Sequence, residues 1–137
     1  MPIARLAIIV AGLAALYLPS GTGAEPDAVL RSRLIGIWEE TRLVDNERYE
    51  QRIALTKDGQ FEVKGTHVED NKPTPFTWRG KWQVKNGKFL YSTTFSDPPD
   101  LYPPGESFED TIVSVSSTEW VMIEQSTGNE SRSRRVK

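Results

Sequence analysis

The chain has 137 residues and no cysteine, with 37% hydrophobic and 26% charged residues. This length suits one domain, and the absence of cysteine excludes disulfides, zinc–thiolate sites and thiol chemistry. A formal net charge of −2 gives no electrostatic reason to expect a nucleic-acid partner. The chain has a single histidine, His67, whereas most metal centres and catalytic triads need more histidine or cysteine side chains than this sequence offers. We therefore expect no metal, no cofactor and no catalytic residues.

Residues 1–24 have the three-part pattern of a secretory signal peptide. Arg5 supplies a positive charge, an apolar run follows, and small residues precede Glu25. The apolar run is too short for a membrane-spanning helix, which needs about 20 residues. We expect a single mature domain over residues 25–137, with no membrane span, in the periplasm or outside the cell.

A short helix is predicted at the start of this domain. Pro26 and Asp27 suit the first turn of a helix, because proline needs no donor there and an acid complements the helix dipole. Leu30 and Leu34 then recur at helical spacing. The pattern predicts a helix over residues 27–35.

From Trp38 onward, apolar and polar residues alternate with a period of two, which is typical of strands with one buried face. The longest stripes run from Phe76 to Val84 and from Phe89 to Phe95. Asp58-Gly59 and Asn86-Gly87 are two-residue hairpin turns, because these residue types tolerate positive φ. The predicted strands cover residues 38–45, 48–56, 60–67, 75–85, 88–95, 107–115, 119–125 and 130–136.

Eight antiparallel strands joined as neighbours can form a sandwich or close into a barrel. Sandwiches usually need Greek-key crossovers, which short consecutive hairpins disfavour. Closure also removes the edge strands. The sequence therefore predicts an all-β fold: an eight-stranded antiparallel up-and-down barrel with a short N-terminal helix.

The order and spacing of several motifs resemble those of the lipocalins, most closely the small bacterial secreted lipocalin-like (calycin-type) domains. The motifs are L-x-G-x-W at residues 34–38, DG-x-F at 58–61, G-x-W-x-V-x-x-G-x-F at 80–89, and arginines in the last strand. The resemblance implies that Trp38 lies at the closed base of the barrel, with an arginine of the last strand across its face in a cation–π contact. Whether this is Arg132, Arg134 or Arg135 is left open.

Two groups of polar residues are candidates for chemistry. His67, beside Glu69 and Asp70, is either a metal ligand or general base, or an ordinary loop histidine, which we favour. An enzyme would depend on His67, yet the sequence names no reaction. Glu40 and Arg42 share the strand parity of Trp38, so we expect one or both to point inward, where they pair with each other or meet a polar ligand, unless the assigned face is wrong.

The inward aromatic residues either fill the core or line a pocket. The predicted ligand-binding residues are Trp78, Trp82 and Tyr91 of the stripes, with Leu101 and Tyr102 of the proline-rich segment 96–107. We expect a non-catalytic binding protein for a small hydrophobic molecule. The alternative is a protein-binding module, an enzyme inhibitor or envelope-assembly factor, that docks an envelope or secreted protein through residues 25–35 or this segment.

The connections between strands also give the barrel two different ends. The tight turns at residues 57–59, 86–87 and 116–118 share one end, which the helix can cover. The mouth is expected at the other end, rimmed by residues 67–74 and 96–106, because longer loops carry binding groups more often.

Overall fold

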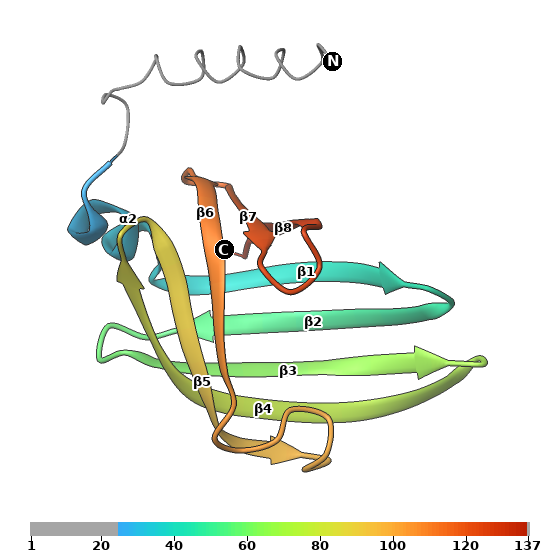
Figure 1. Cartoon of the computed structure of the whole chain (residues 1–137). Coiled ribbons are helices and arrows are strands. Elements are labelled where there is room, and N and C mark those ends of the chain that lie inside the picture. Colours follow the sequence, from blue (N-terminus) through green and yellow to red (C-terminus); the bar gives the residue numbers. More distant parts are fainter. Residues whose placement is uncertain (1–24, 137) are drawn as a thin grey trace, which may run out of the picture.

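Eight strands form a closed antiparallel barrel within residues 25–136, the part of the chain that the computed structural model describes. Every strand pairs with its neighbours along the chain, and β1 meets β8 to close the barrel (Figure 1). The elements are α2 (Asp27–Leu34), β1 (Gly36–Val44), β2 (Glu47–Leu55), β3 (Gln60–Glu69), β4 (Lys72–Lys85), β5 (Lys88–Asp97), β6 (Ser107–Val115), β7 (Glu119–Glu124) and β8 (Glu130–Arg135). The predicted fold class, with its short helix and eight strands, is confirmed.

The predicted signal peptide, residues 1–24, lies outside the described residues. Within residues 25–136, helix α2 has neither the length nor the apolar character that crossing a membrane requires.

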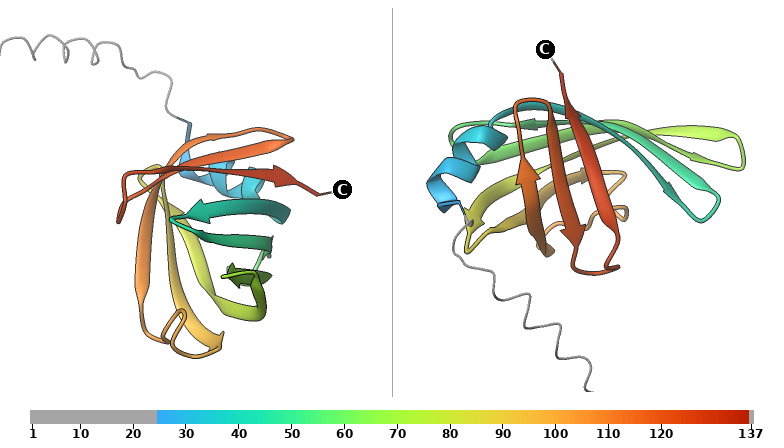
Figure 2. Two further views of the ribbon diagram at one scale, coloured as in Figure 1. Left: turned by 90° about the vertical axis from the view of Figure 1, so that its right-hand side faces the viewer. Right: turned by 90° about the horizontal axis from the view of Figure 1, so that it is seen from above.

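Helix α2 covers the end of the barrel that carries the tight turns, as predicted (Figure 2). The Asp27 carboxylate accepts hydrogen bonds from the backbone N–H groups of Asn86 at 2.8 Å and Gly87 at 2.9 Å. Arg31 donates to the carbonyl of Lys57 at 2.9 Å. The helix is therefore fixed to two separate hairpin turns by polar contacts.

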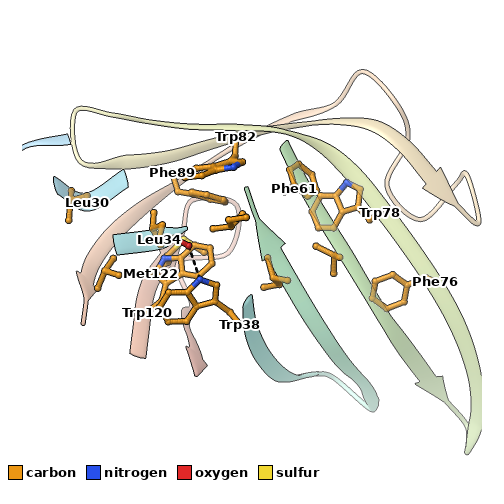
Figure 3. Close-up of a cluster of buried hydrophobic side chains, with 14 residues drawn as sticks. Leu30, Leu34, Trp38, Phe61, Phe76, Trp78, Trp82, Phe89, Trp120 and Met122 are labelled. Carbon is orange, nitrogen blue, oxygen red and sulfur yellow. Dashed lines mark hydrogen bonds between the residues drawn. The ribbon is translucent and has the colours of Figure 1, made fainter. Parts of the chain in front are cut away.

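The interior beside the helix is filled with aromatic rings (Figure 3). Trp120 packs edge-on against Trp38, with ring centroids 5.6 Å apart, and against Phe89 at 5.0 Å. The indole nitrogen of Trp38 donates to the carbonyl of Leu34 at 2.9 Å. This hydrogen bond satisfies a buried donor and ties the first strand to the end of the helix.

The seam between β1 and β8 is short. Only two residue pairs join these strands among the described residues, Trp38 with Arg135 and Glu39 with Arg134, whereas β1 pairs with β2 along its whole length. Both pairs lie at the helix end of the barrel. The seam is therefore closed beside the helix and unpaired toward the opposite end.

Arg135 is the arginine that packs on Trp38, which settles the choice that the sequence leaves open. Its guanidinium lies 4.2 Å from the ring centroid of Trp38. The same group donates to the carbonyls of Ile35 at 3.1 Å, Ser117 at 3.0 Å and Arg33. Gly36 makes room for it: at φ 141° a side chain is strained, and a Cβ would clash with this guanidinium.

The expected inward position of Phe95 is wrong. A register shift in the β4–β5 pairing leaves Gly80 opposite Thr93 but Arg79 opposite Phe95, so one extra residue of β5 forms a bulge. The bulge reverses the alternation, so Phe95 faces outward, 42% exposed, under the guanidinium of Arg79. Ser96 takes the buried position instead.

We predict that Arg135→Ala lowers the free energy of unfolding by about 2–3 kcal/mol, because it removes a cation–π contact and leaves backbone carbonyls without a charged donor. Arg134→Ala is the matched control. Its side chain is 79% exposed and pairs with Glu39 at the surface, so we expect a loss below about 1 kcal/mol. Urea denaturation followed by tryptophan fluorescence measures both, and equal losses would contradict this role of Arg135.

Candidate functional site

The half of the barrel away from α2 contains a cavity of about 430 Å³. Its lining includes Tyr102 from the β5–β6 connection, Ser107 at the start of β6, and residues 125–127 from the β7–β8 turn, all at the end opposite the helix. The sequence leaves open whether the aromatic residues fill a core or line a pocket. The structure shows a filled core beside the helix and a hollow beyond it.

Aromatic rings form most of the apolar wall of this cavity. Tyr102 stacks on Trp78 with ring centroids 3.7 Å apart and planes at 7°. Phe61 meets Trp78 edge-on at 5.2 Å, and Tyr91 stacks on Phe108 at 5.0 Å. Because these rings support one another, the wall is held in place before any ligand arrives.

The proline-rich segment folds back so that Tyr102 reaches the cavity. The hydroxyl of Ser96 donates to the carbonyl of Pro98 at 2.7 Å and accepts the backbone N–H of Tyr102 at 3.3 Å. Burial raises the pKa of Tyr102 to about 12, so its hydroxyl stays protonated at neutral pH.

One wall of the cavity is polar and contains the predicted inward pair of Glu40 and Arg42. Arg42 lies 3.6 Å from Glu40 but only 2.6 Å from Glu124, so the pair is part of a group of three charges. Gln51 donates to Glu40 at 3.0 Å, and the Gln51 side-chain oxygen is buried with no hydrogen-bond partner within residues 25–136. Burial raises the pKa of Glu40, although the charge of Arg42 opposes this shift.

Asp110 adds another buried carboxylate to the same cavity. It accepts a hydrogen bond from the Tyr91 hydroxyl at 2.7 Å and another from the backbone N–H of Gln125 at 3.3 Å. Burial raises its pKa, and the nearby charge of Glu124 adds to the shift. Glu40, Asp110 and Glu124 thus share this wall with the guanidinium of Arg42, so hydrogen-bond acceptors outnumber charged donors there.

The structure brings together three of the five predicted ligand-binding residues. Trp78, Tyr91 and Tyr102 line the cavity. Trp82 lies instead at the helix end, where its indole nitrogen donates to the carbonyl of Thr56 at 3.2 Å, and Leu101 packs against the core outside the lining. That any of the five binds a ligand stays a prediction.

The rim differs from the expected one. Tyr102, Ser107 and residues 126–127 line the cavity, but residues 67–74 do not. The long strands β3 and β4 carry that turn past the β7–β8 turn, as the right-hand view of Figure 2 shows.

Sequence reasoning misses Asp110, Gln51 and Glu124. Asp110 has a usable signal, because it shares the strand face of Phe108 and Ile112, which pack against the core. Gln51 and Glu124 have the same signal, since Gln51 shares a strand face with Ile53 and Glu124 shares one with Met122. Their partners, Glu40 and Arg42, depend on contacts across strands that no local pattern contains.

No family model matches the chain, and no curated protein matches its sequence. The chain is similar to solved structures of designed barrels. One is a de novo designed fluorescence-activating β-barrel, with 19% identity and a TM-score of 0.48 over 82% of this chain and 100% of that one. Another is a redesigned β-barrel, mFAP1, bound to DFHBI, with 15% identity and a TM-score of 0.43 over 77% of this chain and 97% of that one.

We predict that Glu40→Gln changes how stability depends on pH. Because the folded state raises the pKa of Glu40, the folded protein binds more protons than the unfolded chain as pH rises above the ordinary glutamate range. In that window ionisation of Glu40 lowers stability, and glutamine has no such charge. Urea denaturation measures the free energy of unfolding of the variant and of the unsubstituted protein at pH 5 and at pH 8. We expect the variant to be more stable, relative to the unsubstituted protein, at pH 8 than at pH 5. A difference that is the same at both pH values would contradict the assigned shift.

Proposed function

We propose that this protein is a non-catalytic binding protein that holds a small, mainly apolar molecule inside its barrel. The observation that carries the proposal is the cavity of about 430 Å³ with its aromatic wall. Small-molecule sites are typically cavities of about 300–1,000 Å³ with mostly apolar walls and a few placed polar groups. Trp78, Tyr91 and Tyr102 supply the apolar surface that such a ligand would cover.

The polar wall indicates which polar group the ligand carries. Glu40, Asp110 and Glu124 accept hydrogen bonds. The side-chain oxygen of Gln51 is a further acceptor, and it has no hydrogen-bond partner within residues 25–136. Arg42 is the charged donor of this wall and is already engaged by Glu124. A ligand with a hydrogen-bond donor, such as an amine, would complement this wall, whereas a carboxylate would add to its negative charge.

The alternative, a protein-binding module, finds less support in the contacts of its candidate segments. Asp27 and Arg31 of α2 are committed to hairpin turns of the same barrel. Tyr102, the aromatic residue of the proline-rich segment, stacks inward on Trp78 rather than facing outward. Both segments therefore serve the barrel itself.

The proposed location is the periplasm or the cell exterior. It rests on the signal-peptide pattern of residues 1–24. A carrier of apolar molecules in an aqueous compartment would shield its ligand from water, which agrees with a cavity inside a closed barrel.

We predict that 2-(2-naphthyl)ethylamine binds more tightly than 2-naphthylacetic acid, a ligand with the same ring system and the opposite charge. The naphthalene ring would meet the aromatic wall, and the ammonium group would meet the carboxylates. Titration of tryptophan fluorescence measures both affinities. If neither compound binds with a dissociation constant below about 1 mM, which is a binding free energy of about −4 kcal/mol, the carrier proposal fails. Tighter binding of the acid would contradict the assigned polarity alone.

A second prediction tests where the ligand enters. Tyr102→Ala removes the ring that stacks on Trp78 in the aromatic wall at the mouth and should weaken binding of the naphthyl amine. Lys57→Ala is the matched control, because Lys57 lies in the β2–β3 turn at the helix end and is exposed. A loss of affinity in the Lys57 variant and none in the Tyr102 variant would place the site at the wrong end.

A further inference from the structure

Strands β2 and β3 bring Glu47, His67 and Glu69 together at the barrel end opposite α2. Tyr49 pairs with His67 across the two strands, and the same register continues to set Glu47 beside Glu69. One potential ligand atom from each of the three side chains lies within 4.8 Å of the other two. The sequence suggests His67 with Glu69 and Asp70, but the structure replaces Asp70 with a residue from the neighbouring strand.

The charges of this cluster are poorly balanced. Like charges that face each other across adjacent strands destabilise a sheet. Within residues 25–136, the Glu47 carboxylate lies 2.6 Å from Nε2 of His67, and Glu69 has no basic nitrogen within 4.0 Å.

The imidazole of His67 is held in a fixed orientation. Its ring lies flat on that of Tyr49, with centroids 4.4 Å apart and planes at 9°, and its side chain is 18% exposed. Tyr49 in turn meets Phe76 edge-on at 6.3 Å. This packing directs Nε2 toward Glu47 and limits the rotamer freedom that binding would otherwise have to remove.

We propose that Glu47, His67 and Glu69 bind a divalent transition-metal ion such as zinc, with water in the remaining coordination positions. One imidazole nitrogen and two carboxylate oxygens are ligands that zinc accepts, whereas calcium and magnesium prefer oxygen alone. At metal–ligand distances of about 2.0–2.2 Å, ligand atoms of one shell lie about 3–3.5 Å apart. His67 and Glu47, now 2.6 Å apart, then need to separate by less than about 1 Å, and Glu69, within 4.8 Å of both, needs to approach by less than about 2 Å. This site departs from the absence of metal expected from the sequence.

The metal site is independent of the proposed ligand cavity. None of its three residues lines that cavity, and the rings of Tyr49 and Phe76 lie between them and Tyr102. Failure of naphthyl-amine binding therefore leaves the metal proposal standing, and the reverse also holds.

Isothermal titration of the full chain with zinc chloride tests the proposal. We expect one zinc ion per chain with a micromolar dissociation constant, weakened at least tenfold by His67→Ala and by Glu47→Gln. Glu50→Gln is the control, because Glu50 is a glutamate of the same strand that is paired with Arg48 at 2.9 Å and lies outside the cluster. It should bind zinc as the unsubstituted chain does.

The single histidine provides a readout that needs no variant. NMR signals of the His67 imidazole should move on addition of zinc, since no other histidine contributes to that spectrum. Absence of zinc binding would overturn the proposal. Zinc binding that leaves the His67 signals in place, or that persists unchanged in both substituted chains, would overturn it as well.

Discussion

The contact between the guanidinium of Arg135 and the ring of Trp38 is the interaction on which the rest of the barrel depends. It lies at the place where the last strand meets the first, and within residues 25–136 the two strands share only two residue pairs. A cation–π contact contributes about 0.5–2 kcal/mol. Because the same guanidinium also binds carbonyls that follow α2 and that precede β7, it joins the helix, the seam and a hairpin turn at one point.

This arrangement explains why the interior is filled at one end and hollow at the other. The helix contributes Leu30 and Leu34 to the core, and three of the four tryptophans gather beside it (Figure 3). Beyond them no second helix covers the barrel within residues 25–136, and the β1–β8 seam is unpaired. Charged side chains such as Glu40 and Arg42 can occupy that half because they pair with each other and retain some access to water.

The parts of the fold that the sequence predicts well are those set by neighbours in the chain. Asn86-Gly87 forms the expected two-residue turn, with positive φ at both residues, because positive φ is a local requirement. Asp58-Gly59 also lies in a turn, but the connection is four residues long, 56–59, and Gly59 rather than Asp58 has positive φ, so the expected two-residue turn is wrong there. A strictly alternating pattern predicts the wrong face for Phe95, because such a pattern contains no bulge. In the structure a bulge forms where the β4–β5 pairing shifts at Gly80. The arginine on Trp38 depends on strand parity, which the pairing of β1 with β8 decides.

The candidate sites are harder to predict for a related reason. The aromatic wall follows from alternation, so Trp78 and Tyr91 are within reach of the sequence. The partners of the polar groups come from different strands: Glu47 beside His67 and Glu124 beside Arg42 require a register that no local pattern contains. Sequence spacing favours Asp70 as a neighbour of His67, but Asp70 lies in the turn with φ 51°.

The short seam has a consequence for how the molecule meets its own copies. Free backbone groups along the unpaired part of β8 could add a strand from a second molecule, as exposed sheet edges do. Arg134 and Arg135 are paired with β1, so the outward residues of the unpaired part are Glu130 and Arg132, whose side chains pair with each other at 3.3 Å. Charged side chains therefore line this edge, which is one of the ways in which natural sheets disfavour edge-to-edge association.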